Sequence, residues 1–200
     1  MLEAVEQIER FKEYFESEEK QTILEAVSSG KASVTIDFAK LSPYDPALAL
    51  DLLEHPEDTF KAAEQSIKEI ELPTNVSKLK VRVINLSEAA TVRIRDLRVK
   101  NLSTFVSIQG VIRQKSPVRP KAVSTRYECP NCGNAITKIQ EGETIKEPKL
   151  CSCGRKGNFR LIEKQQIDFQ ALIIEESLED VPSGDKGDRI VALLKEDLTL

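Results

Sequence analysis

Four cysteines, the only ones in the 200-residue chain, form two close pairs, a C-x-x-C motif at 129–132 and a C-x-C motif at 151–153, with eighteen residues between them. Each pair supplies two thiolates from one turn, and the intervening chain can form a hairpin that brings the pairs together. Gly133 and Gly154 follow the pairs, where a tight turn around a metal needs positive φ. We therefore predict a structural zinc site. Its expected ligands are Cys129, Cys132, Cys151 and Cys153.

Three other uses of these cysteines fit the sequence less well. Disulfides would need an oxidising compartment, and the sequence shows no signal peptide. A redox C-x-x-C motif usually stands alone at a helix start, without a second pair. A catalytic zinc usually has histidine or carboxylate ligands, and the one histidine, His55, is distant in sequence and precedes a proline. A structural site is the preferred interpretation, and the short spacer of the second pair leaves open whether all four sulfurs bind the ion.

Acidic and basic residues are separated along the chain, whose formal net charge is −4. From Met1 to Glu64, fifteen acidic and six basic residues give a balance of −9; from Arg93 to Arg126, nine basic residues and one acidic residue give +8. This asymmetry predicts two modules with different partners. No apolar run has the length of a membrane span, so we expect a soluble protein. The nine basic residues are Arg93, Arg95, Arg98, Lys100, Arg113, Lys115, Arg119, Lys121 and Arg126.

The first module is predicted to be a helical bundle. Near its start, apolar residues recur every three or four positions, as on the buried face of a helix. A second helix should end at Gly30, and a short strand should follow at Ser33–Phe38. Asp45 and Pro46 have the types expected at a helix start, and the helix should restart at Pro56. The apolar residues of the first helix are Leu2, Val5, Ile8, Phe11 and Phe15.

Beyond a linker expected at Leu72–Asn75, the pattern changes to the period-two alternation of strands with one buried face. Several short strands without long helices predict a small antiparallel barrel, in which Gly110 should mark a bend. The cysteine loop is expected to be inserted between its strands, with a turn at Pro182–Gly184 later in the barrel. The predicted strand stretches are VSKLKVRVINL, VRIRDL, TFVSIQGVIRQKS, KAVSTRYEC, NFRLIEKQQIDFQALIIEES and DRIVALLKEDLTL.

A small barrel with a basic face is a platform for single-stranded nucleic acid, and cationic side chains there would give salt-sensitive binding to phosphates. Alternation should place Arg93 and Arg95 on one strand face. Arg119 and Lys121 flank Pro120, so we expect them in a loop or hairpin. A merely solvated basic surface is an equally weighted alternative. Aromatic residues are sparse, so we expect contact with the nucleic-acid backbone rather than base stacking.

The run DLRVKNLSTFVSIQGVIRQKSPVRPKAVSTRYECPNCG resembles the amino-terminal half of the minichromosome maintenance (MCM) proteins, the replicative DNA helicases of archaea and eukaryotes. In that family such a phrase opens an oligonucleotide-binding (OB) barrel and leads into a zinc ribbon. The run QQIDFQALIIEESLEDVPSGDKGDRIVALLKEDLTL is similar to later barrel strands and their loop. The likeness covers essentially the whole chain, and archaeal members match best. It implies an α+β fold with a helical bundle at 1–75, an OB-fold barrel at 76–126 and 160–200, and a zinc-binding insertion at 127–159.

The resemblance also implies a function. The family's amino-terminal half is not an enzyme, and this sequence lacks the G-x-x-x-x-G-K-[ST] phosphate loop of an ATPase. It would assemble into a hexamer, double hexamer or filament around single- or double-stranded DNA in the archaeal cytoplasm, beside a carboxy-terminal ATPase that this chain lacks. Glu175–Asp188 would match the loop that communicates between the two halves. The DNA-binding candidates are Arg113, Arg119, Lys121, Arg126 and Arg189.

The sequence departs from the family pattern at its end, and a second function remains open. The sequence stops at Leu200, before the last barrel strands and the DNA-binding hairpin of the family, so we expect a truncated barrel. The alternative function is a free-standing zinc-containing OB-fold protein that binds single-stranded nucleic acid without a motor.

Overall fold

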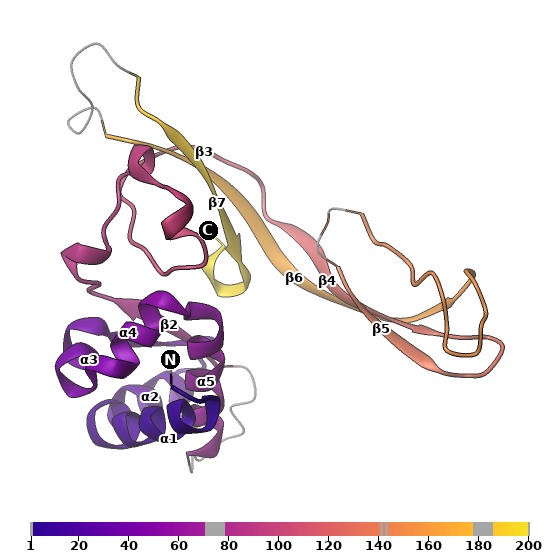
Figure 1. The fold of residues 1–200 in the computed structure, drawn as a ribbon, viewed down its shortest axis with the longest axis horizontal. Helices are drawn as coiled ribbons and strands as arrows, with labels where there is room; N and C mark the ends of the chain where they lie inside the picture. Colours follow the sequence, from indigo (N-terminus) through magenta and orange to yellow (C-terminus); the bar gives the residue numbers. More distant parts are fainter. Residues whose placement is uncertain (1, 71–78, 141, 143, 178–185, 200) are drawn as a thin grey trace. The chain divides into compact units, whose positions relative to one another are not determined.

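The computed structural model describes residues 2–70, 79–140, 142, 144–177 and 186–199 (Figure 1). It divides into two compact units: unit 1 comprises Met1–Val111 with Glu175–Arg189, and unit 2 comprises Ile112–Ile174 with Ile190–Leu200. The predicted linker at 72–75, the turn at 182–184 and most of the 175–188 loop lie outside the described residues. None of the helices in the described part of the chain has the length and apolarity needed to cross a membrane.

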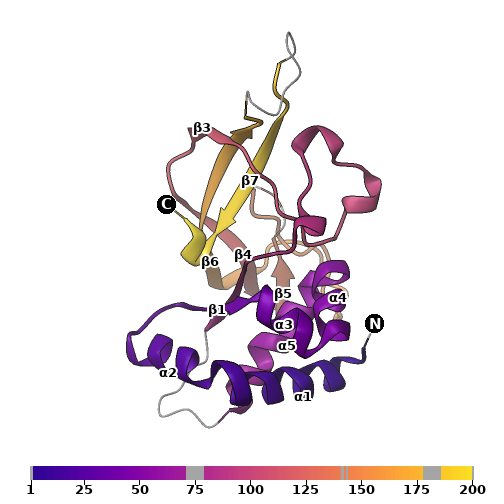
Figure 2. The ribbon, with the colours of Figure 1, turned by 90° about the vertical axis from the view of Figure 1, so that its left-hand side faces the viewer.

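Several helix boundaries of unit 1 lie where the sequence predicts, whereas the helix at Phe38–Tyr44 was not predicted. The Asp45 side chain accepts hydrogen bonds from the backbone N–H groups of Ala47 and Leu48 at 3.0 and 3.1 Å, with Pro46 in the first turn. Gly30, just after the second helix, has a φ of 65°. Figure 2 shows α1 and α2 following one another along one side of the unit. The helices are α1 (Ala4–Tyr14), α2 (Lys20–Ser28), α3 (Phe38–Tyr44), α4 (Pro46–Glu54) and α5 (Pro56–Glu69).

The buried stripe of α1 differs from the predicted one. Gln7, Phe11 and Tyr14 are buried, whereas Val5 is 67% exposed, so its predicted burial is wrong. At 3.6 residues per turn, Val5 lies about 160° around the helix from Gln7. The helix continues into a π-helical turn at Phe15–Glu19, which buries Phe15 against the Phe11 ring at a centroid distance of 5.7 Å.

A parallel pair of strands lies within unit 1. β1 (Ser33–Asp37) confirms the predicted strand, and it pairs with β2 (Lys80–Ile84) from Ser33 opposite Lys80 to Asp37 opposite Ile84. The expectation that β2 belongs to the barrel is therefore wrong. Val34 and Val81 are each 1% exposed and belong to the core that the helices form, so burial of these side chains accounts for the pairing of β2 with β1.

The second sheet has five strands, in the order β3-β6-β4-β5, with β7 also paired to β6. β4 is antiparallel to both β5 and β6, and Figure 1 shows β4 and β6 running side by side as a long ribbon. No pairing among the described strands closes this sheet into a ring. Its strands are β3 (Val111–Lys115), β4 (Arg119–Glu128), β5 (Ala135–Ile139), β6 (Arg160–Glu175) and β7 (Arg189–Lys195).

The stretch before β3 is built from short turns rather than strands. 3-10 turns occupy Glu88–Ala90, Ile94–Asp96 and Val99–Asn101, so the strand predicted for VRIRDL is wrong. Gly110 immediately precedes β3 instead of bending a long strand. The alternating pattern of VRIRDL has a different cause, since Ile94 is buried while the flanking arginines bind carboxylates of unit 1.

Candidate metal centre and nucleic-acid interface

The four cysteine sulfurs of unit 2 form one cluster. All lie within 4.8 Å of one another, and the Sγ atoms of Cys129 and Cys153, and those of Cys132 and Cys151, are 3.6 Å apart. Zn–S bonds of about 2.3 Å in tetrahedral geometry place sulfur atoms about 3.8 Å apart. The donor set and its spacing therefore fit one tetrahedral metal ion with four sulfur ligands.

Two tight turns bring the sulfurs together. The N–H of Gly133 donates to the Cys129 carbonyl at 2.8 Å, and that of Gly154 donates to the Cys151 carbonyl at 3.0 Å. The glycines have φ values of 69° and 86°, which confirms their predicted positive φ. Cys129 and Cys151 are buried in one cluster with Tyr127 and Phe159, so one cysteine of each pair joins the small core of unit 2.

The surroundings of Cys153 favour its thiolate. The pKa of this thiol is lowered to about 6, first because the backbone N–H of Arg155 donates to it and then because the Asn131 amide donates at 3.7 Å. The thiolate is the form of cysteine that binds metals. Backbone and amide donors thus prepare this exposed sulfur for a cation.

Between Ala122 and Ser124, β4 contains one extra residue relative to β6. Ala122 lies opposite Gln166, whereas Ser124 lies opposite Gln165, so Val123 has no partner of its own and forms a β-bulge. A bulge of one residue changes which side chains share a face, because side chains otherwise alternate strictly along a strand.

The bulge brings three predicted DNA-binding residues to one face. Arg119, Lys121 and Arg126 lie opposite residues 169, 167 and 163, which alternate along β6 and therefore share one side of the sheet. Without the extra residue, Arg126 would point to the other side. Arg119 and Lys121 lie within β4, so their predicted loop is wrong; Pro120 is tolerated there because it is near the strand end.

This cationic face, defined by Arg119, Lys121 and Arg126, has a half-buried aromatic at one end and a hollow at the other. The Lys121 ammonium lies 4.5 Å from the centre of the Phe169 ring. Arg126 lines a hollow of about 320 Å³. Its other lining residues come from β4, β5 and β6, and they are Ser124, Ala135, Thr137, Glu163 and Gln165.

The other predicted basic residues have different surroundings. Arg113 is exposed in β3, and Arg189 is at the first position of β7, in unit 1. Arg95 binds Glu176, and Arg98 donates to the backbone carbonyls of Arg95 and Leu97 at 2.7 and 2.8 Å. The expectation that Arg93 and Arg95 share a strand face is therefore wrong, and both have carboxylate partners within unit 1.

Two charged residues that the sequence analysis did not single out lie on the cationic face. Glu163 is opposite Arg126, and Arg160 is opposite Glu128 at the end of the same ribbon. Their placement depends on the register of β4 and β6, which are more than thirty residues apart in sequence. The alternation of IEKQQID marks a strand but does not indicate its partner.

Comparison with known proteins gives one consistent result. A family model described as MCM OB domain matches residues 93–200. The chain is 30% identical over 172 residues to DNA replication licensing factor MCM2 of Arabidopsis thaliana, covering 81% of this chain and 18% of the relative. It is 25% identical over 192 residues to the minichromosome maintenance protein MCM of Saccharolobus solfataricus, covering 89% of this chain and 28% of the relative. The chain thus spans less than a third of the length of these relatives.

The fold has a match among solved structures. The crystal structure of the N-terminal domain of an archaeal MCM superposes with a TM-score of 0.72 at 23% sequence identity, covering 98% of this chain and 82% of that chain. The match includes the helical region as well as the sheet, which confirms the α+β architecture expected from the sequence resemblance.

Proposed function

Because the chain belongs to the MCM OB domain family, we propose that it is the DNA-binding and ring-forming amino-terminal region of an ATP-dependent replicative DNA helicase. In this proposal the chain itself is not an enzyme. It holds DNA and joins subunits into a hexamer or double hexamer, while a carboxy-terminal ATPase supplies the motor. The proposed substrate is single-stranded DNA, with duplex DNA as a second ligand of the ring.

The observation that carries the proposal is the cationic face. Three positive side chains share one side of β4, because the bulge at Val123 places Arg126 on the same side as Arg119 and Lys121. An OB sheet is a common platform for single-stranded nucleic acid. The Lys121 ammonium lies over the Phe169 ring, and the side chain remains half-buried. Such a face would contact phosphates, and the partial exposure of Phe169 leaves room for a contact with a base.

Zinc is the metal we propose for the four-cysteine cluster. Four thiolates in tetrahedral arrangement are a usual ligand set of structural zinc, and no open position is left for catalysis. The cluster joins the end of β4 to the segment before β6, and the zinc would fix the loop between them, as in the proposed insertion at 127–159. When bound, the ion supplies cross-links rather than chemistry.

The test of DNA binding replaces Arg119 and Lys121 together by alanine. We expect the slope of log affinity against log salt to become shallower by about 1.4, the value for two lost phosphate contacts on a single strand. Fluorescence anisotropy with a labelled oligonucleotide at several salt concentrations measures it. The control is Lys20→Ala with Lys164→Ala, which removes the same charge from α2 and from the opposite face of β6.

The same samples test assembly. Light scattering with and without oligonucleotide should show a species of several subunits for the unaltered chain. An unchanged salt slope in the Arg119 and Lys121 variant would show that these side chains are merely solvated. A strictly monomeric chain without DNA affinity at low salt would contradict the proposal as a whole.

A further inference from the structure

Arg189 differs from the other DNA-binding candidates because one side of its guanidinium is already held. Its Nε donates to a carboxylate oxygen of Glu175 at 2.7 Å. The Glu175 side chain is only 11% exposed, whereas that of Arg189 is 66% exposed. A buried acid therefore holds the inner edge of an exposed guanidinium. No other polar contact of Arg189 is found within the described part of the chain, and the exposure of its side chain leaves the two terminal nitrogens accessible to solvent.

The backbone next to Arg189 is fixed by a second acid. The carboxylate of Glu176 accepts a hydrogen bond from the Asp188 N–H at 3.2 Å, and the Glu176 N–H donates to the Asp188 carbonyl at 3.1 Å. The residue immediately before Arg189 is thus tied to the residue immediately after Glu175. Gly187 passes close by, since a Cβ at this position would lie 3.2 Å from the Glu176 carbonyl oxygen.

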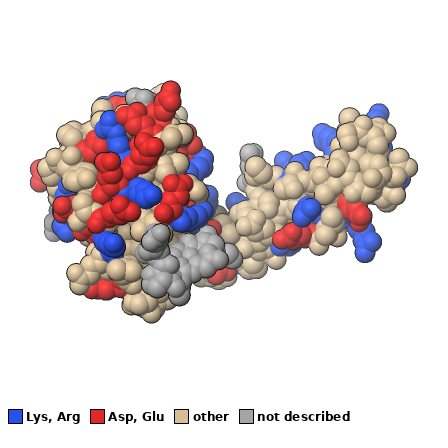
Figure 3. All heavy atoms as spheres, turned by 90° about the horizontal axis from the view of Figure 1, so that it is seen from below, with Lys and Arg blue, Asp and Glu red and all other residues tan. Residues whose placement is uncertain are grey.

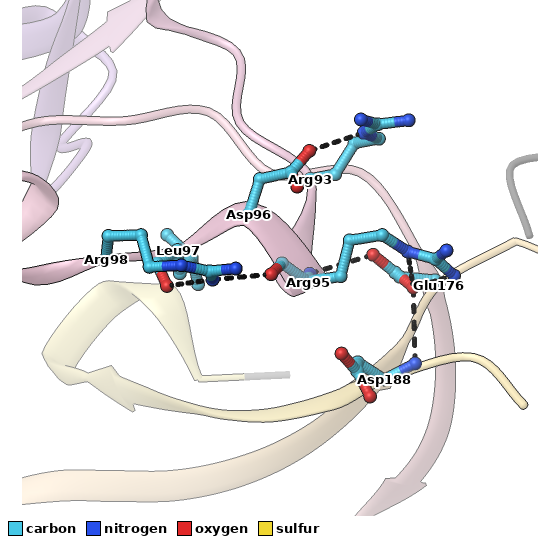
Figure 4. A network of polar contacts seen from close by, with 7 residues as sticks. All are labelled: Arg93, Arg95, Asp96, Leu97, Arg98, Glu176 and Asp188. Atoms are coloured by element: carbon cyan, nitrogen blue, oxygen red, sulfur yellow. Dashed lines mark hydrogen bonds and ion pairs between the residues drawn. The ribbon is translucent and has the colours of Figure 1, made fainter.

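Glu176 is in turn anchored to the 3-10 turn at Ile94–Asp96. Arg95 donates to it three times, through its backbone N–H at 2.9 Å and through Nε and Nη2 at 3.0 and 2.8 Å (Figure 4). The Glu176 side chain is 4% exposed and that of Arg95 is 22% exposed. A well-aligned, multiply bonded pair of this kind is rigid, unlike an exposed ion pair.

We propose that Glu175 is a positioning residue for DNA binding: its buried carboxylate holds Nε of Arg189 so that the two terminal nitrogens are presented, in a fixed orientation, to a phosphate of the DNA backbone. The hydrogen bonds of Glu176 with Arg95 and with the Asp188 backbone fix the position of the backbone next to Glu175 and Arg189. The inference rests on the proposed DNA-binding function and adds to it one residue, an acid, that assists a polyanion to bind.

A carboxylate near a phosphate site has two opposing effects. Its charge repels DNA, and its hydrogen bond reduces the number of rotamers that Arg189 must give up on binding. The two effects can be separated because glutamine keeps an acceptor oxygen without the charge. Glu175→Gln and Glu175→Ala lose the same charge, so the part of their difference in affinity that depends on Arg189 reports the hydrogen bond.

The experiment measures single-stranded oligonucleotide binding by the 200-residue chain across a salt series. The variants are Glu175→Gln, Glu175→Ala, Arg189→Ala, and Arg189→Ala combined with each Glu175 change. We expect Glu175→Ala to bind about 3- to 10-fold more weakly than Glu175→Gln, and this difference to vanish when Arg189 is alanine. The salt slope should be shallower by about 0.7 in Arg189→Ala.

Different failures have different meanings. Equal affinity of Glu175→Gln and Glu175→Ala would overturn the positioning role and leave the cationic face intact. A difference that persists without Arg189 would also overturn it, since Glu175 would then act by supporting the fold. If Arg189→Ala leaves the affinity and the salt slope unaltered, Arg189 does not contact a phosphate. The proposed DNA-binding function is contradicted only if the Arg119 and Lys121 test also fails. Melting temperature and metal content, unchanged in each variant, exclude a general loss of structure.

Discussion

At the four cysteines, the short spacing within each pair determines the local turns but not how the two pairs meet. Each pair and its glycine lie within a few residues, so the positive φ values of Gly133 and Gly154 follow from local chemistry. The meeting of the two pairs is not local, and it depends on the β4–β5 hairpin and on the return of the chain to β6. The cysteine spacing was therefore sufficient to predict a metal site, whereas burial of only one cysteine in each pair required the fold.

Replacing Cys129 by serine should abolish stoichiometric zinc binding. A serine oxygen is a poor zinc ligand, and this position is fully buried, so the remaining three sulfurs would hold the ion weakly. Elemental analysis of the purified chain measures the metal content. Ser152→Ala, which changes a side chain between two ligands without removing a sulfur, should keep the zinc. Full zinc content in Cys129→Ser would contradict ligation by all four thiolates.

The ion pair of Glu176 with Arg95 should make the melting temperature depend on pH in the acid range. The pKa of Glu176 is lowered from 4.5 to about 2, chiefly because the Arg95 side chain donates to it. An acid with a depressed folded-state pKa stabilises the fold fully above its ordinary pKa and loses this contribution as the pH falls through the folded-state value. The melting temperature should therefore fall more steeply between about pH 4.5 and about pH 2 in the unaltered chain than in Glu176→Gln.

The matched control for this measurement is Glu163→Gln, an exposed carboxylate on β6. Loss of zinc at low pH affects all three proteins alike, so the comparison isolates Glu176. Parallel pH profiles for the unaltered chain and Glu176→Gln would show that the bonds with Arg95 do not contribute to stability in this range.

At the scale of elements, the bulge at Val123 determines which basic side chains share the face proposed to bind DNA. Deleting this residue restores strict alternation in β4, which moves Arg119 and Lys121 to the face opposite Arg126. We expect the deletion to weaken DNA binding as much as alanine at both of these positions. Val123→Ala keeps the residue count and should bind normally. Anisotropy measures the binding, and zinc content shows whether the distal part of the ribbon remains folded; normal binding by a zinc-loaded deletion variant would contradict the shared face.

Elements defined by local signals were predicted well. The capping Asp45, the glycine after α2, and the alternation of β6 and β7 each depend on neighbouring residues alone. The stretch around Arg93 and Arg95 was predicted wrongly because alternation also arises when Ile94 is buried between two arginines with carboxylate partners. The partner of Arg95 is 81 residues away, so no local pattern reveals it. The same limit hid the bulge, which exists only relative to β6.

At the scale of the whole molecule, the acidic and basic stretches of the sequence correspond only in part to units 1 and 2. The space-filling view in Figure 3 shows acidic side chains gathered over the helices, in line with the balance of −9 from Met1 to Glu64. The basic stretch from Arg93 to Arg126 spans both units, and the first arginines in it have partners within unit 1. Net charge along the sequence therefore overstates the positive charge available to a polyanion, and only the residues from β4 onward form the shared face.

The pairing of β1 with β2 determines where this protein can be dissected. β1 and β2 flank α3, α4 and α5 in sequence and pair with each other in parallel. Val81 of β2 is also part of the hydrophobic core that the helices form. A chain shortened to residue 75 should therefore lose cooperative thermal unfolding and aggregate through the bare edge of β1, whereas one ending at residue 90 should melt in a single transition by circular dichroism. The smallest autonomous piece of the amino-terminal region is thus longer than its run of helices.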